Sequence, residues 1–130
     1  MIEASKTISS KIDEIYQIAT EVREGFELQS LDPKIVWSRY CRWVPDARHW
    51  DKDKFLSLAN TAFPLGCCGL ASAFLSEEVD IGCGIPEHIL YKDEPHTILL
   101  GSLAMIDITA DQFGGPRIYV GPMVRPWSER

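Results

Sequence analysis

Residues 96–107 read HTILLGSLAMID, and this stretch decides the fold. Two apolar halves meet at Gly101-Ser102, where glycine followed by a small polar residue favours a two-residue hairpin of type II′ or I′. In that register Leu100 lies opposite Leu103, and His96 lies directly opposite Asp107, with Cα atoms about 5 Å apart. The stretch therefore predicts an antiparallel hairpin carrying an imidazole–carboxylate pair on one face.

The same face of this hairpin is otherwise apolar, which favours a cleft edge over open surface. A carboxylate that accepts from one imidazole nitrogen fixes the ring and leaves the other nitrogen free to take a proton from a thiol. The alternative is a cross-strand polar pair on a solvated face. A four-residue loop with the same centre keeps the register, whereas a three-residue loop destroys it. The neighbours of the pair on this face are Ile98, Leu100, Leu103 and Met105.

Around the hairpin, helical patterns precede strand patterns. After Gly82-Cys83-Gly84 come short apolar runs separated by Gly, Pro and Asp, which indicate strands over 88–91, 96–100, 103–109 and 117–120. Before it, helical spacing predicts helices over 7–24, 33–43, 52–60 and 68–79. The sequence thus predicts one α+β domain over 1–130, with a helical part (1–62) and an antiparallel sheet behind a further helix (63–130).

Two of the helix boundaries have specific signals. Asp32-Pro33 is an N-cap followed by proline at the first helical position, which predicts the start of the second helix. Gly25 predicts the end of the first helix. The apolar stripe of that first helix consists of Ile8, Ile12, Ile15, Tyr16, Ala19 and Val22.

Composition excludes several classes of protein. With 45% hydrophobic and 25% charged residues, the chain is globular rather than disordered or fibrous. A net charge of −6 without a basic stripe disfavours nucleic acid and anionic membranes as partners. No apolar run reaches the length of a membrane span, and no apolar signal core follows Met1, so we expect a cytoplasmic protein. Its four cysteines are then expected to be reduced thiols.

A cysteine pair stands where the fourth helix is expected to start. A helix N-terminus stabilises a thiolate, the nucleophilic form of cysteine, although buried structural cysteines are common. Helical phase separates the two residues. Cys67 lies three, four and seven positions before Leu70, Ala71 and Phe74, so it points to the core. Cys68 lies on the flank, where a substrate can reach it, and is the preferred nucleophile.

These residues form a larger pattern: FPxGCCG at 63–69, Ser72, His96 and DITADQF at 107–113. Over about the last 70 residues the pattern resembles papain-like and transglutaminase-like cysteine hydrolases, including a group of small bacterial proteins. The resemblance implies a papain-like fold, with Cys68 as nucleophile, His96 as general base and acid, and Asp107 as the residue that orients His96.

Two features depart from that resemblance. Papain-like enzymes usually carry a glutamine shortly before the cysteine as an oxyanion donor, whereas the upstream amide here is Asn60, eight residues before Cys68. The backbone N–H of Cys68 is a second candidate donor. The residues after His96 also lack the aromatic side chain common in such proteins, so contacts to the substrate are expected to differ.

The expected function is a thiol-dependent hydrolase or acyl transferase that acts on an amide or ester bond of a peptide, protein or small molecule. Protease, deamidase and transglutaminase-like chemistry share this mechanism, and none needs a cofactor or metal. The alternative is a catalytically inactive interaction module of the same fold, in which the tryptophan-bearing helix contacts a partner.

Several other residues are weaker candidates. Gln112 faces the site or caps the turn at 114–116, and Cys67 and Asn60 complete the supporting set. His88 either lies near His96 across the sheet or is an exposed residue without a role. A zinc site from Cys67, Cys68, Cys83 and a histidine has enough ligands, but adjacent cysteines do not fit the usual spacing.

Overall fold

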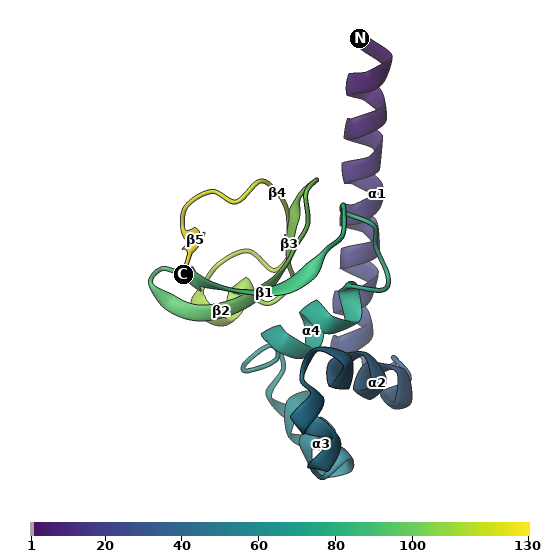
Figure 1. Cartoon of the computed structure of the whole chain (residues 1–130), viewed down its shortest axis with the longest axis vertical. Helices are drawn as coiled ribbons and strands as arrows, with labels where there is room; N and C mark the ends of the chain where they lie inside the picture. Colours follow the sequence, from purple (N-terminus) through teal and green to yellow (C-terminus); the bar gives the residue numbers. More distant parts are fainter. Residues whose placement is uncertain (1) are drawn as a thin grey trace.

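The computed structural model describes residues 2–130, with side chains described from residue 10 onward. Over this range the chain is α+β, and helices precede an antiparallel five-stranded sheet, as the sequence predicts (Figure 1). Two short 3-10 helices interrupt the order. The α-helices are α1 (Ile2–Glu27), α2 (Pro33–Trp43), α3 (Lys52–Ala62) and α4 (Cys68–Leu75), the 3-10 helices are η1 (Pro45–His49) and η2 (Ala110–Phe113), and the strands are β1 (Ile85–Tyr91), β2 (Glu94–Leu100), β3 (Met105–Asp107), β4 (Tyr119–Gly121) and β5 (Trp127–Glu129).

Helix α1 extends past its predicted end. Its buried residues include Ile15, Ala19, Val22 and Phe26, which follow the helical spacing of one apolar face. Gly25 does not end the helix, because its role is close packing: a Cβ there would lie 2.6 Å from a methyl carbon of Leu31. The side chain of Ile8, part of the predicted stripe, lies outside the described residues.

The second helix begins where the sequence predicts. The Asp32 carboxylate accepts from Lys34 N (2.9 Å), and Pro33 opens α2. Helix α4 begins at Cys68 as expected but ends at Leu75, four residues before Val79. After Leu75, backbone N–H groups bond to carbonyl groups three residues earlier instead of four. Glu77 N donates to Phe74 O, and Glu78 N donates to Leu75 O. This tightening ends the α-helix early.

The strands follow the order β4-β3-β2-β1-β5, and each neighbouring pair is antiparallel. The four predicted strands are present with shifted ends. The sequence did not predict β5, in which Trp127 pairs with Tyr91 of β1. Helix α4 packs on β2 on one side and on α2 on the other, and α1 contacts both α4 and β4 (Figure 1).

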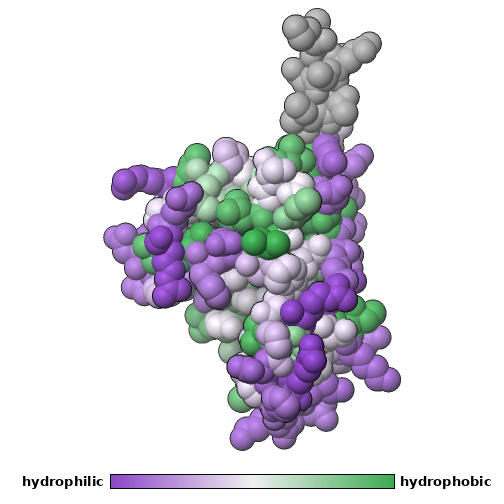
Figure 2. Space-filling view, viewed as in Figure 1, coloured by the Kyte–Doolittle hydropathy of each residue, from purple (hydrophilic) through white to green (hydrophobic). Residues whose placement is uncertain are grey.

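Two apolar clusters cover the two faces of the sheet. The larger cluster joins the helices to one face, and the smaller one joins the other face to the segment after β3. Figure 2 shows hydrophobic residues gathered where the sheet region meets α1, while the surface along α1 and over α3 is largely hydrophilic. The smaller cluster contains Ile89, Tyr91, Ile98, Met105, Ala110 and Trp127.

The predicted register of the β2–β3 hairpin is wrong by two residues. Leu100 pairs with Met105 rather than Leu103, and Gly101 N donates to Ala104 O (3.0 Å), so Ser102 and Leu103 form the tip. The tip lies one residue later than predicted because it packs on residues 81–82. Ser102 N donates to Gly82 O and Leu103 N to Ile81 O, both at 2.9 Å, and a Cβ on Gly101 would overlap Ile81 O.

This one-residue shift of the turn keeps His96 and Asp107 on the same face of the sheet. Moving a two-residue turn by one position changes the sum of paired residue numbers by two, so the alternation of faces is preserved. His96 and Asp107 therefore share a face as diagonal neighbours rather than as a directly opposed pair. Diagonal neighbours lie about 7 Å apart, within reach of an imidazole and a carboxylate.

None of the helices in the described part of the chain combines the length and the apolar character that crossing a membrane requires.

Candidate active site

His96 and Asp107 form a buried pair. The His96 Nε2 atom lies 2.8 Å from Asp107 Oδ2, and the two residues are 3% and 2% exposed. The Phe113 ring packs edge-on against His96 at 5.1 Å between centroids. The pair is therefore inside the protein, covered by the segment after β3, and not at the rim of an open cleft as the sequence suggested.

Two further groups hold the Asp107 carboxylate. The indole N–H of Trp127 donates to Oδ2 (2.7 Å), and the backbone N–H of Thr109 donates to Oδ1 (2.9 Å). The Thr109 hydroxyl contributes a longer bond of 3.5 Å to Oδ1. These hydrogen bonds fix the position of the carboxylate beside His96. Sequence reasoning missed Trp127, because no local pattern links it to a strand 20 residues earlier.

The position of α4 explains how Cys68 reaches this pair. The β2–β3 ladder covers only two residue pairs, Leu99 with Ile106 and Leu100 with Met105, so Thr97 lies beyond its end. There the Ser72 hydroxyl of α4 donates to Thr97 O (3.4 Å). Cys68 lies one helical turn before Ser72 on the same side of α4. The first turn of α4 thus lies beside residues 96–97.

The two nitrogens of the His96 ring have different surroundings. Nε2 binds the carboxylate, while Nδ1 is buried and has no hydrogen-bond partner in the described part of the chain. Cys68 and His96 each shift the pKa of the other, which places the thiol near the ring. Nδ1 is therefore the ring nitrogen that is free to exchange a proton with sulfur.

The electrostatics favour a thiolate–imidazolium pair. Burial acts to raise the pKa of Cys68, but His96 first and Thr97 second outweigh burial, and the pKa of Cys68 falls below its ordinary value. Burial acts to lower the pKa of His96, but hydrogen bonds with Asp107 and Cys68 raise it from 6.5 to about 9. Both shifts favour the charged forms near neutral pH.

Cys67 has the opposite environment. Its side chain is 1% exposed, and its thiol donates to Ala59 O (3.3 Å) and Leu65 O (3.5 Å). Burial, with the nearby Cys68, raises the pKa of Cys67 to about 11, so this sulfur stays protonated. The division predicted from helical phase, with Cys67 packed and Cys68 available, agrees with these contacts.

Gln112 lies beside the segment that leads to Cys68. Its Oε1 accepts from Gly66 N (3.2 Å), two residues before Cys68. Its Nε2 is buried and has no hydrogen-bond partner among the described residues. Because Phe113, the next residue, packs on His96, Gln112 lies between the two sides of the site. The Gln112 amide therefore has a donor that the described residues leave unused.

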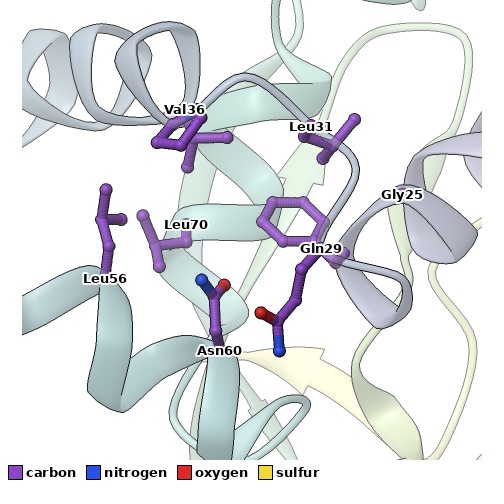
Figure 3. A pocket seen from close by; sticks show the side chains of 9 residues that line it. Gly25, Gln29, Leu31, Val36, Leu56, Asn60 and Leu70 are labelled. Carbon is purple, nitrogen blue, oxygen red and sulfur yellow. The ribbon is translucent and has the colours of Figure 1, made fainter.

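Asn60 is not part of this cluster. It lines a cavity of about 200 Å³ between α1, α2, α3 and α4, together with Leu70. Leu70 lies about 200° around α4 from Cys68, so the cavity is on the other side of the helix. Figure 3 shows the amide groups of Asn60 and Gln29 on one side of this cavity and apolar side chains on the other.

The remaining candidates contribute little. His88 is exposed, and its Nδ1 lies 3.0 Å from the Thr97 hydroxyl rather than against His96. In the described part of the chain, no three His, Cys, Asp or Glu side chains are grouped to hold a metal ion. Cys41, Cys67, Cys68 and Cys83 are all free thiols.

No protein-family model, curated protein or solved structure matches this sequence. The site must therefore be interpreted from its own chemistry.

Proposed function

We propose that this protein is a thiol-dependent hydrolase or acyl transferase of the papain-like or transglutaminase-like kind, acting on an amide or ester bond. One observation carries the proposal: His96 binds Asp107 through Nε2 and keeps a buried Nδ1 without a hydrogen-bond partner, near a thiol whose pKa is lowered. Cys67, which packs in the core without such a partner, has a raised pKa instead.

The chemistry has two halves. The Cys68 thiolate attacks the substrate carbonyl carbon, a C–S bond forms, and the π electrons move to the carbonyl oxygen. When this oxyanion collapses, the C–N or C–O bond breaks and His96 Nδ1 gives its proton to the leaving group. A thioester remains. Water, or an amine in the acyl transferase, then attacks the thioester while His96 takes its proton, and the thiolate is released.

Asp107 keeps the imidazole in the productive tautomer. Its carboxylate accepts from Nε2, so the proton that is exchanged with sulfur and substrate is the one on Nδ1. The bonds from Trp127 and Thr109 keep the carboxylate oriented. Asp107 therefore stabilises the imidazolium without itself taking a proton.

Two donors are available for the oxyanion. The backbone N–H of Cys68 lies at the start of α4, where no side chain of the described residues caps the helix. Gln112 Nε2 is buried without a partner and belongs to a side chain fixed two residues from the nucleophile. A substrate carbonyl oxygen would supply its missing acceptor. Gln112 thus fills the role for which Asn60 is too distant.

The test is the rate at which iodoacetamide alkylates Cys68 between pH 5 and 10, with the modified residue identified by mass spectrometry. We expect rapid alkylation near neutral pH that is lost in His96→Ala, and acylation by thiol-directed acyl electrophiles at the same residue. A Cys68 thiol that titrates at the ordinary value of about 8.5 would instead favour the inactive interaction module.

A further inference from the structure

Helix α1 places the buried guanidinium of Arg23 next to the candidate active site. Arg23, 4% exposed, donates through both terminal nitrogens to Asp111, with two bonds of 2.7 Å. The same guanidinium donates to Ile108 O at 2.7 Å. This paired geometry fixes direction as well as distance. Arg23 therefore holds the segment 108–111 at two points.

That segment carries the groups that build the site. It begins after Asp107, includes Thr109, whose N–H binds the Asp107 carboxylate, and ends before Gln112. A shift of this backbone would move Thr109 N away from Asp107 and Gln112 away from Gly66. Asp107 in turn orients His96, so the position of the segment determines how the imidazole meets the thiol.

Arg23 also contacts the other side of the site. Its guanidinium carbon lies 4.9 Å from the centroid of the Phe63 ring, and Phe63 stacks on Phe26 of α1 at 5.2 Å. Phe63 opens the segment that leads through Gly66 to Cys68. A cation over an aromatic face stabilises their contact. One side chain thus connects the segment before the nucleophile to the segment after the orienting carboxylate.

We propose that Arg23 is a positioning residue for the Cys68–His96–Asp107 site, which makes α1 part of the device that activates the thiol. The inference rests on the proposed function. Arg23 has no hydrogen bond to any of the three site residues, and it acts through Ile108 and Asp111 on one side and Phe63 on the other. A guanidinium is suited to this task because lysine has no second nitrogen for the paired bond.

The experiment measures the pH profile of Cys68 alkylation by iodoacetamide in the full chain, for wild type, Arg23→Lys and Asp111→Asn. Both variants keep a polar group at the altered position. We expect each profile to shift toward the ordinary thiol value, with the alkylation rate at pH 6.5 reduced about tenfold for a shift of one pH unit. Asp111 is 28% exposed, so its variant serves if Arg23→Lys does not fold.

Arg39→Lys is the matched control. Arg39 also donates to a backbone carbonyl, Phe74 O (2.9 Å), to a carboxylate, Glu78 (2.7 Å), and lies over an aromatic ring, Phe74 (4.3 Å). These contacts are at the end of α4, away from Cys68. We expect Arg39→Lys to lower the melting temperature without shifting the alkylation profile.

The outcomes separate the two proposals. If Cys68 of the wild type is alkylated with the pH dependence of an ordinary thiol, the proposed function itself is wrong. If the wild-type alkylation profile lies at lower pH, and Arg23→Lys and Asp111→Asn both fold and keep that profile, only the positioning role is wrong. If only Asp111→Asn folds, its profile decides in the same way.

Discussion

The indole N–H of Trp127 donates to the same Asp107 oxygen that binds His96. The distances from Oδ2 are 2.7 Å to Trp127 Nε1 and 2.8 Å to His96 Nε2. A single carboxylate oxygen therefore ties β5 to the imidazole on β2, across the strand β1 that lies between them. Since Trp127 is 4% exposed, its N–H has no solvent to replace this acceptor.

Trp127→Phe should weaken the site while keeping an aromatic ring in the smaller apolar cluster. Loss of a hydrogen bond to a buried charged group costs about 1 to 3 kcal/mol, which denaturant unfolding will measure. Without the indole donor, the Asp107 carboxylate is free to turn away from His96 Nε2, so the Cys68 alkylation profile should move to higher pH.

Tyr119→Phe is the control for that prediction. The Tyr119 ring packs on Trp127 at 4.3 Å, but its hydroxyl donates to Pro122 O on the exposed side. Its removal should leave the alkylation profile unchanged. Equal profile shifts in both variants would mean that a general disturbance of this cluster, rather than loss of the indole N–H, moves the profile.

Cys68→Ser and Cys67→Ser should differ in kind. Cys68→Ser should abolish turnover and acylation with little change in the free energy of unfolding, because this residue is partly exposed. Cys67→Ser buries a hydroxyl in a site shaped for sulfur and should cost about 1 to 2 kcal/mol while acylation of Cys68 persists. Mass spectrometry of the acylated protein and denaturant unfolding measure the two effects. The reverse result would move the nucleophile to Cys67.

The pH dependence of stability should expose the coupling of His96 and Cys68. The pKa of folded His96, about 9, exceeds the value of 6.5 in the unfolded chain, so its contribution is complete below pH 6.5 and is lost as pH rises to about 9. Cys68 has a lowered pKa, so its contribution is present above the unfolded thiol value and is lost as pH falls through the folded value.

These two contributions oppose each other in the wild type, because moving a proton from thiol to imidazole leaves the number of bound protons unchanged. Cys68→Ser removes one of them, while Asp107 still raises the pKa of His96. Its free energy of unfolding should therefore fall between pH 6.5 and 9 more steeply than that of the wild type. Parallel curves from denaturant unfolding across this range would contradict a coupled pair.

Gly101→Ala should destabilise the protein by about 1 to 3 kcal/mol, because the added Cβ overlaps Ile81 O and pushes the hairpin tip from its dock. Gly69→Ala in α4 is the comparison. Its Cβ would meet only Tyr40 at 3.4 Å, an ordinary contact, and alanine suits a helix better than glycine. Denaturant unfolding should show a lower free energy of unfolding for Gly101→Ala and a higher one for Gly69→Ala. If Gly101→Ala leaves the free energy of unfolding unchanged, the contact of the hairpin tip with residues 81–82 is not the cause of the register.

The sequence predicted those features of the structure that depend on neighbouring residues alone. The Asp32-Pro33 cap placed the start of α2, and helical phase separated Cys67 from Cys68. Alternation of faces brought His96 and Asp107 to the same side of the sheet. That prediction survived a wrong register, because a turn that moves by one residue preserves alternation.

Contacts between distant segments were beyond such signals. The hairpin tip follows from the carbonyl groups of residues 81–82, which no turn preference encodes. Trp127 and Arg23 lie on elements whose patterns describe only their own strand or helix, and their links to Asp107 and Asp111 arise when the elements pack together. Gly25 looked like a helix end because glycine serves both as a terminator and as a site of close packing.

The lowered pKa of Cys68 depends on a histidine and a threonine that reach it only through tertiary structure. During synthesis, or after denaturation, the same sulfur is an ordinary thiol that is mostly protonated at neutral pH. A protonated thiol is a weaker nucleophile than a thiolate and is oxidised more slowly. In the proposed mechanism, Cys68 therefore becomes reactive only once the chain has folded.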